Sequence, residues 1–305
     1  MRVYTHPACL EHQPGPGHPE SPARLKAVTG ALRAAFPDLQ WHEAPQATRE
    51  NLLRVHTQAL VHRVLDADTS ETAFRLDHDT VMSAGSREAA LRAAGAVVAA
   101  VDAVLGGDVP HAFCAVRPPG HHATRDTAMG FCLFNGIAVG AAHAVLSHGL
   151  SRVSVVDFDV HHGNGTEDIF AAESRVQYVS SHQAPLYPGT GAETDVGVGN
   201  VANAPLPPRT GSQDFRAAWR ERLLPAIERF QPQLILISAG FDAHRLDPLA
   251  DLDLQAEDFR WLSAELAELA QRHAKGRLVS VLEGGYSLTA LRECSVAHLR
   301  GLGAA

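Results

Sequence analysis

The sequence contains no apolar run long enough to cross a membrane. A transmembrane helix needs about 20 consecutive apolar residues, and no run in this chain of 305 residues approaches about 18. The first ten residues also lack the apolar segment that a secretory signal carries. We therefore expect a cytoplasmic protein that is neither exported nor bound to a membrane.

Cysteine pairs and positive charge are also lacking. The four cysteines, Cys9, Cys114, Cys132 and Cys294, lie far apart and form no C-x-x-C pair, which favours reduced thiols. The formal net charge of −8 gives no electrostatic attraction for nucleic acid. Neither nucleic acid nor membrane is therefore an expected partner. The oligomeric state stays open, and a homo-oligomer is compatible with the sequence.

Buried strands alternate with helices along the whole chain, without a linker or an internal repeat. Apolar, β-branched runs predict strands at 111–116, 153–158, 176–181, 234–238 and 278–282, after a short first strand at Val3 and Tyr4. Helices are predicted at 22–36, 86–105, 135–147, 214–230, 256–273 and 288–299, with Ser21 as a cap and a kink at Pro225. The pattern predicts one α/β domain over 1–305, with a mostly parallel, doubly wound sheet flanked by helices.

Polar motifs follow five of the predicted strands. They occupy 120–122, 157–162, 181–191, 240–247 and 283–286. Ligands of open α/β sheets bind beyond the carboxyl ends of the strands, so we expect these loops to form the active site along one edge of the sheet. The long Gly/Pro-rich loop at 183–199 has no predicted structure of its own, which is often a sign of function.

The sequence DFDVHHGNG follows the strand at 153–158. Alternate residues of an extended chain point the same way, so Asp157, Asp159 and His161 are expected to converge. Helix capping would explain one aspartate, but not two carboxylates and two imidazoles at the end of a buried strand. Carboxylate oxygen with imidazole nitrogen suits zinc or another first-row divalent ion.

A third ligand is expected from another part of the chain. Asp242 in SAGFDAH directly follows the strand at 234–238; a turn or cap aspartate is its structural alternative. Asp159, His161 and Asp242 would leave a coordination position open for water or substrate, as catalytic metal sites do. A metal held there would lower the pKa of a water and polarise a carbonyl.

Two further motifs supply groups for acid–base chemistry. A lone loop histidine is usually a surface residue, but the tandem His121 and His122 beside a metal site are expected to include a general base. Tyr286 follows Gly284 and Gly285, which allow the loop to approach closely. Its hydroxyl would donate to a developing oxyanion, unless Tyr286 is a half-buried structural residue.

The motifs PPGHH, GFCLFN, DFDVHHGNGT, YPGTG, SAGFDAH and EGGY, in this order, resemble the zinc-dependent histone deacetylase family with the arginase/deacetylase fold. The resemblance extends from His18 to Tyr286, and GHHA and GNG are similar to the class II and bacterial branch. It implies hydrolysis of an N-acyl amide, most simply acetyl-lysine in a protein or peptide. It also implies one Zn²⁺ per chain and a structural K⁺, while the choice between zinc and iron stays open.

The resemblance implies roles for the matching residues. These are Asp159, His161 and Asp242 as zinc ligands, His121 and His122 as catalytic histidines, and Tyr286 as the oxyanion-stabilising residue. Asp157 matches the partner of the first histidine, which also helps to hold K⁺. Asn164 stands where class I members have an aspartate, and a neutral amide raises the pKa of His122 less than a carboxylate would. His122 is therefore expected to be the base and His121 the electrostatic stabiliser.

The resemblance also implies a substrate tunnel. Its expected residues are Gly130, whose carbonyl accepts the substrate amide hydrogen, Phe131 and Tyr187 as aromatic walls, Asp79 and Leu249 at the rim, and Gly284. Relatives that act on acetylated polyamines can carry a glutamate at the position of Leu249. We therefore expect acetyl-lysine to be preferred over small acetylated amines, although core packing is the alternative explanation for this leucine.

Two other functions fit parts of the pattern. A ureohydrolase with two manganese ions needs an S-x-D-x-D pattern, and SAGFDAH supplies only Asp242. A non-catalytic module that recognises acyl groups would not need His121, His122 and Tyr286 together. The presence of all three favours an enzyme.

Overall fold

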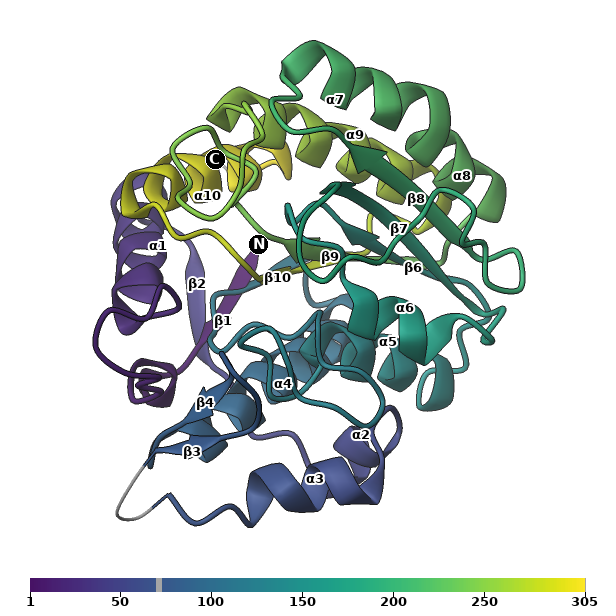
Figure 1. Ribbon diagram of the computed structural model, residues 1–305. Helices are drawn as coiled ribbons and strands as arrows, with labels where there is room; N and C mark the ends of the chain where they lie inside the picture. The colour runs from purple at the N-terminus through teal and green to yellow at the C-terminus, as the bar shows by residue number, and fades with distance from the viewer. Residues whose placement is uncertain (70–72, 305) are drawn as a thin grey trace.

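The framework of the protein is an eight-stranded sheet between two layers of helices (Figure 1). The computed structural model describes residues 1–69 and 73–304. The strands lie side by side in the order β2 (Gln40–Glu43), β1 (Arg2–Thr5), β5 (His111–Cys114), β10 (Leu278–Leu282), β9 (Leu234–Ala239), β6 (Val153–Asp157), β7 (Val176–Gln183) and β8 (Val201–Leu206). Every pairing in this sheet is parallel, which confirms the predicted fold class.

The five strands that precede the polar motifs are neighbours at the centre of the sheet. They are β5, β10, β9, β6 and β7, and apart from His111 all of their residues are buried. Their apolar, β-branched sequences suit a strand that is covered on both faces. Because the strands are parallel and adjacent, their five following loops meet along one edge, as predicted.

Helices cover both faces of the sheet (Figure 1). One face carries α1 (Pro22–Ala35), α8 (Leu224–Phe230), α9 (Ala256–His273) and α10 (Leu288–Gly301), and the other carries α4 (Ser86–Leu105), α5 (Gly136–Leu146) and α6 (Asn164–Phe170). The remaining helices are α2 (Arg49–Leu53), α3 (Gln58–Leu65) and α7 (Ser212–Ala218), with a 3-10 turn at Pro7–Leu10. No helix in the described part of the chain is both long and apolar enough to cross a membrane.

Four short strands differ from the prediction. The sequence pattern does not show β2, β8 and the separate antiparallel pair β3 (Phe74–Arg75) and β4 (Val81–Met82). β2 and β8 are the edge strands of the large sheet, where polar residues and proline are tolerated. β8 indeed contains Pro205, which argues locally against a strand.

Two helix details also differ from the prediction. Ser21 lies at the N-cap of α1, but its side chain makes no capping hydrogen bond. The helix predicted at 214–230 is divided into α7 and α8 by a π-helical turn at Trp219–Leu223. Pro225 has no backbone N–H, so the regular hydrogen-bond ladder is interrupted where the predicted kink lies.

Candidate active site

Asp159, His161 and Asp242 meet beyond the carboxyl ends of β6 and β9. One ligand atom from each residue lies within 4.8 Å of the others. His161 Nδ1 lies 3.1 Å from Asp159 Oδ1 and 3.2 Å from Asp242 Oδ2. The two strands pair directly, which explains how a DxDxH motif meets an aspartate far along the chain. The structure thus brings together the three predicted ligands.

The surroundings of these residues fit a divalent cation. Asp242 is buried, and its Oδ2 has no aligned hydrogen-bond partner among the described residues. Burial and the neighbouring Asp159 raise the pKa of Asp242 to about 7. Burial alone would lower the pKa of His161, but its close contacts with the two negatively charged aspartates raise it to about 10. A bound cation would relieve this crowding of buried carboxylates, and the O, N, O donor set suits zinc.

Two glycines make room for the metal ligands. A Cβ at Gly240 would lie 2.0 Å from Asp159 Oδ2, and one at Gly284 would lie 2.0 Å from Asp242 Oδ2. The backbone N–H of Gly284 donates to Asp159 Oδ2 over 2.8 Å. Gly284 therefore lies against the carboxylates, whereas the sequence predicted it to contact the substrate.

Asp157 faces His121 rather than the three converging ligands. Its Oδ2 lies 2.9 Å from His121 Nδ1 and accepts a hydrogen bond of 3.2 Å from the Tyr178 hydroxyl. Burial would lower the pKa of His121, but Asp157 and Asp159 together raise it to about 10. The two carboxylates thus favour the protonated form of His121, which is the form that an electrostatic stabiliser needs.

His122 has the opposite electrostatic environment. Burial, then the neighbouring His121 and His161, hold the pKa of His122 well below its ordinary value. Its Nδ1 lies 2.8 Å from Asn164 Oδ1, so the neutral ring donates from Nδ1 and keeps the Nε2 lone pair free. This is the protonation state that a general base needs.

Glu283 holds the histidine loop in place, a role that the sequence interpretation missed. This carboxylate is buried and accepts hydrogen bonds from Gly120 N over 2.7 Å and from His121 N over 3.2 Å. Burial raises the pKa of Glu283 to about 7. The available signal was a carboxylate directly after a buried strand, in the same motif as Tyr286.

A buried network of ion pairs supports the loop after β10, residues 283–287, which we call the tyrosine loop because it carries Tyr286. Arg117 Nη2 lies 2.6 Å from Glu20 Oε2, and Arg24 Nη1 lies 3.0 Å from Glu20 Oε1. Arg24 also donates to the carbonyls of Glu283 and Gly285, and its guanidinium lies 4.9 Å from the centre of the Tyr286 ring. Glu20 and Arg24 are only four positions apart, but no local pattern indicates Arg117, which is 97 positions from Glu20.

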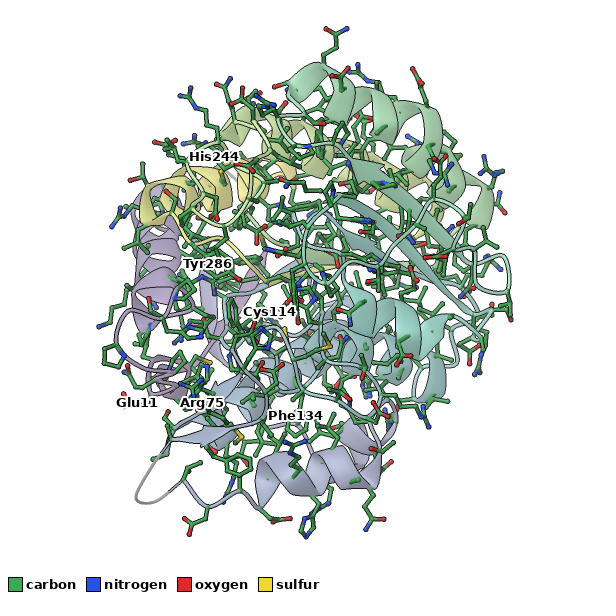
Figure 2. The ribbon with its side chains drawn as sticks, viewed as in Figure 1. Glu11, Arg75, Cys114, Phe134, His244 and Tyr286 are labelled. Carbon is green, nitrogen blue, oxygen red and sulfur yellow. The ribbon has the colours of Figure 1, made fainter. Side chains whose placement is uncertain are left out.

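A cavity of about 220 Å³ reaches His161, one of the three predicted metal ligands. It is lined by Asp79, His122, Gly130, Phe131, His161, Leu186, Tyr187, Leu249 and Tyr286. Every predicted substrate-binding residue except Gly284 is in this lining. Tyr286 lies near the middle of the molecule in Figure 2, in the loop after β10. The structure thus places the predicted base and the predicted oxyanion donor in one cavity.

The aromatic wall formed by Phe131 is held by a backbone with two successive positive φ angles. Gly130 and Phe131 both have positive φ angles, 56° and 67°. A Cβ at Gly130 would lie 2.6 Å from His122 Cδ2, so glycine is needed for this close approach. The N–H of Phe131 donates to Thr80 Oγ1 over 3.1 Å, which fixes the Phe131 backbone.

The opposite wall is formed by Tyr187. Its ring centre lies 5.1 Å from that of His122, with the two planes nearly perpendicular. The Tyr187 hydroxyl is buried and has no hydrogen-bond partner in the described part of the chain. Tyr187 is therefore fixed by packing rather than by a polar contact.

Leu249 lies at the cavity and is 36% exposed, so it is not part of the core. Asp247 Oδ1 accepts a hydrogen bond of 3.0 Å from Leu249 N, and its Oδ2 accepts one of 2.7 Å from Tyr286 N. The Asp247 carboxylate therefore joins the segment with Leu249 to the loop with Tyr286. Asp79 also lines the cavity and is half-buried.

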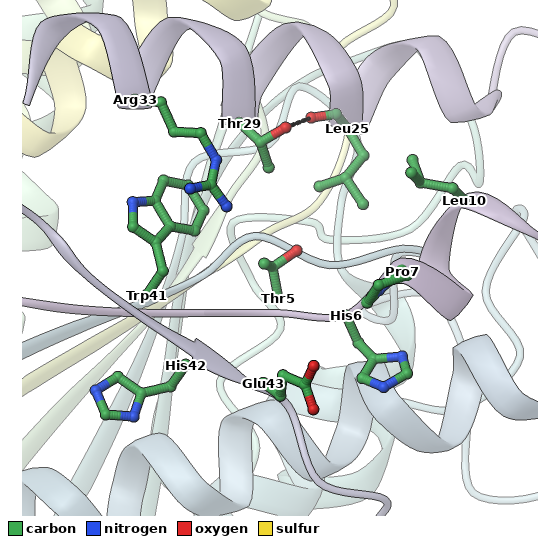
Figure 3. Close-up of a pocket in the computed structure, with 10 residues that line it drawn as sticks. All are labelled: Thr5, His6, Pro7, Leu10, Leu25, Thr29, Arg33, Trp41, His42 and Glu43. Atoms are coloured by element: carbon green, nitrogen blue, oxygen red, sulfur yellow. Dashed lines mark hydrogen bonds between the residues drawn. The ribbon is translucent and has the colours of Figure 1, made fainter. Parts of the chain in front are cut away.

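A second cavity, of about 320 Å³, lies at the end of β1 and β2 (Figure 3). The Arg33 guanidinium covers the Trp41 ring there, 3.9 Å from its centre. None of the predicted metal ligands or catalytic residues lines this cavity. The candidate active site is therefore the smaller cavity beside β6 and β9.

Comparisons with known proteins agree on one family. The family model described as a histone deacetylase domain matches residues 18–302. A histone deacetylase-like amidohydrolase of Pseudomonas aeruginosa is 42% identical over 293 residues, which cover 94% of this chain and 77% of that protein. A probable deacetylase of Archaeoglobus fulgidus is 38% identical over 294 residues, covering 94% and 81%. The crystal structure of the HDA15 HD domain matches with a TM-score of 0.92 and 34% identity, over 99% of this chain and 88% of that one.

Proposed function

This chain belongs to the histone deacetylase family, and we propose that it hydrolyses the acetyl amide of N-acetyl-lysine in proteins or peptides. Residues 1–305 would act as one deacetylase domain, in the cytoplasm. The observation that carries the proposal is the shared cavity, which is lined by His122, Tyr286 and the proposed metal ligand His161. Amide hydrolysis on a metal requires an open coordination position on the ion, a neutral base and a donor for the oxyanion, which His122 and the Tyr286 phenol would supply.

Asp159, His161 and Asp242 would hold one Zn²⁺ ion. When bound, the ion would polarise the acetyl carbonyl and lower the pKa of the attacking water. Gly240 and Gly284 keep the space around the two carboxylates free of side chains. Asp157, at the end of β6, would also help to hold a structural K⁺.

The two histidines would have different roles, proton transfer for His122 and charge stabilisation for His121. His122 is neutral because it is buried beside a protonated His121, so its Nε2 would take the proton from the attacking water. His121 would remain protonated beside Asp157 and stabilise negative charge. Either histidine would then protonate the leaving amine, which gives lysine and acetate.

Tyr286 would stabilise the tetrahedral oxyanion by donating its phenolic hydrogen. The tyrosine loop is tied down at several points, because Arg24 binds the carbonyl of Gly285 and Asp247 binds the N–H of Tyr286. Such ties fix the hydroxyl before substrate binds, and a fixed donor costs little reorganisation during the reaction.

The substrate lysine would lie between Phe131 and Tyr187, with its methylene groups against the two rings. The Gly130 carbonyl would accept the amide hydrogen. At the rim, Asp79 would hold the peptide backbone of the substrate. Leu249 offers no charge to the distant ammonium of an acetylated polyamine, which supports a peptide rather than a small amine as substrate.

The test is acetate release by the purified protein from an acetyl-lysine peptide, in competition with acetylspermidine and acetylputrescine. We expect the peptide to be preferred and the activity to disappear in the His122→Ala variant. A tenfold preference for an acetylpolyamine would instead assign small acetylated amines as substrates. Tight peptide binding without acetate release, in protein with a full metal content, would assign a non-catalytic acyl-binding module.

A further inference from the structure

A second cluster of metal-ligand side chains lies far from the active site, on the helical layer formed by α4 and α5. Asp102 belongs to α4, His143 to the last turn of α5, and His148 follows that helix. The Nε2 atoms of both histidines lie 2.7 Å from the same oxygen, Asp102 Oδ1. One ligand atom from each residue lies within 4.8 Å of the others.

The fold fixes one of the three side chains before any ligand binds. Helices α4 and α5 pack side by side on one face of the sheet (Figure 1). The side chain of His143 is only 11% exposed, whereas those of His148 and Asp102 are 31% and 52% exposed. The two rings are nearly perpendicular, with their centres 5.2 Å apart. One ligand is therefore fixed by the core, and the other two are free to adjust.

Two imidazole nitrogens and one carboxylate oxygen are a donor set for zinc and related ions. Tetrahedral zinc with bonds of about 2.0–2.1 Å separates its ligand atoms by about 3.3 Å. The present spacing of 2.7 Å is that of hydrogen bonds, so binding requires a small outward movement of Asp102 and His148. Water would complete the coordination, because both of these residues are partly exposed.

Arg54 opposes metal binding at this cluster. Its Nη1 lies 2.8 Å from His143 Nδ1. Arginine only donates, so Nδ1 must accept, and the proton of neutral His143 must be on Nε2. A metal needs the other tautomer, with Nε2 free. Glu50 Oε1 lies 3.4 Å from Arg54 Nη2 and offers the arginine another partner when it leaves His143.

We propose that Asp102, His143 and His148 form a second binding site for a zinc-like divalent ion, which joins α4 to the end of α5, and that Arg54 weakens this site. The site is separate from the proposed catalytic metal, because its ligands come from different elements. It would stabilise the helical layer without taking part in acetate release.

The experiment is a calorimetric titration with Zn²⁺ alone, using full-length protein that already holds its first metal. We expect one further ion per chain in the wild type. The His148→Ala and Asp102→Asn variants should each lose it, since losing a ligand weakens binding by more than the roughly 10–100-fold that outer partners contribute. Arg54→Gln should bind the second ion more tightly than the wild type.

The matched control is His62→Ala, which removes an exposed histidine that lies 3.4 Å from a single carboxylate, Asp66. This variant should bind as the wild type does.

The Asp242→Asn variant should retain the second site even without the catalytic metal, which separates this proposal from the proposed function. Thermal unfolding gives a second readout, because zinc should raise the Tm of the wild type more than that of His148→Ala. Equal binding by the wild type, His148→Ala and Asp102→Asn would overturn the proposal.

Discussion

The deep end of the active site and its rim are built in different ways. At the deep end, Asp157, Asp159 and Glu283 are buried and each accepts hydrogen bonds from defined partners. At the rim, Leu249 is partly exposed, and in the wall below it the Tyr187 hydroxyl has no partner among the described residues. The groups proposed to carry out the chemistry are thus held by several partners each, while the side chains proposed to select the substrate make few polar contacts.

The physical reason is the cost of burying charge. A buried carboxylate is tolerated only when hydrogen bonds, opposite charges or a metal compensate for its lost hydration. Each deep residue therefore depends on several others, and a single change should disturb many interactions. The side chain of a rim residue makes few contacts with other side chains. Its replacement should therefore change substrate selectivity without loss of the fold.

The largest effect is expected for Asp242→Asn at the deep end. The amide keeps an oxygen that can accept from Val160 N, as Asp242 Oδ1 does over 2.8 Å, but it removes the charge that binds the metal. We expect loss of both metal and turnover, measured by elemental analysis and acetate release. Asp251→Asn is the control, because this exposed aspartate lies in the same loop and should change neither quantity. Full metal content in Asp242→Asn would contradict the ligand assignment.

Tyr286→Phe tests the boundary between the two regions. It removes one hydroxyl but keeps the ring that contacts Phe131, with ring centres 5.9 Å apart. Losing one oxyanion donor should lower kcat by about 10²–10³. KM and metal content should stay near their wild-type values, as steady-state kinetics and elemental analysis can show. An unchanged kcat would make Tyr286 a structural residue of the wall.

Asn164→Asp should shift the pH profile rather than abolish activity. A carboxylate beside His122 favours its protonated form and therefore raises its pKa. The base must be neutral, so the rate falls as pH drops through this pKa. The acid limb of kcat/KM should therefore move to higher pH in the variant. An acid limb at the wild-type position would exclude His122 as the group that titrates.

The smallest effect is expected at the rim, for Leu249→Glu. An opposite-charge contact at a partly exposed position is worth about 1 kcal/mol, which corresponds to roughly fivefold in kcat/KM. We expect acetylspermidine to gain by this factor relative to an acetyl-lysine peptide. Leu249→Gln is the control for size and polarity without charge, and it should not produce the gain. Equal changes in Leu249→Glu and Leu249→Gln would show that charge at the rim is irrelevant.

Much of the deep end could be predicted from the sequence, because its residues follow strands with a clear apolar pattern. The predicted ligands Asp159, His161 and Asp242 meet in the structure. His121 and His122 have the partners Asp157 and Asn164, which only the family resemblance implied. All strands of a parallel sheet end at the same edge. A motif that directly follows a strand must therefore lie at that edge, wherever it occurs along the chain.

The remaining features depend on contacts that are distant in sequence. Arg24 reaches the carbonyls of the tyrosine loop across about 260 positions, and no local pattern records that distance. β8 contains Pro205 and is a strand only because β7 lies beside it at the sheet edge. The resemblance placed Gly284 among the substrate-binding residues. In the structure its N–H donates to Asp159 Oδ2, 125 positions away, which no local pattern records, and contact with substrate stays a prediction.

The place of β10 at the centre of the sheet has a consequence for the newly synthesised chain. β10 is the last strand to be made, yet it pairs with β5 on one side and β9 on the other. Without β10 the large sheet would fall into two groups of strands, β2-β1-β5 before the loop with His121 and His122, and β9-β6-β7-β8 with the three predicted metal ligands. We therefore expect a chain that stops before residue 278 to leave the candidate site incompletely assembled, so that synthesis of this strand is a late step in forming the site.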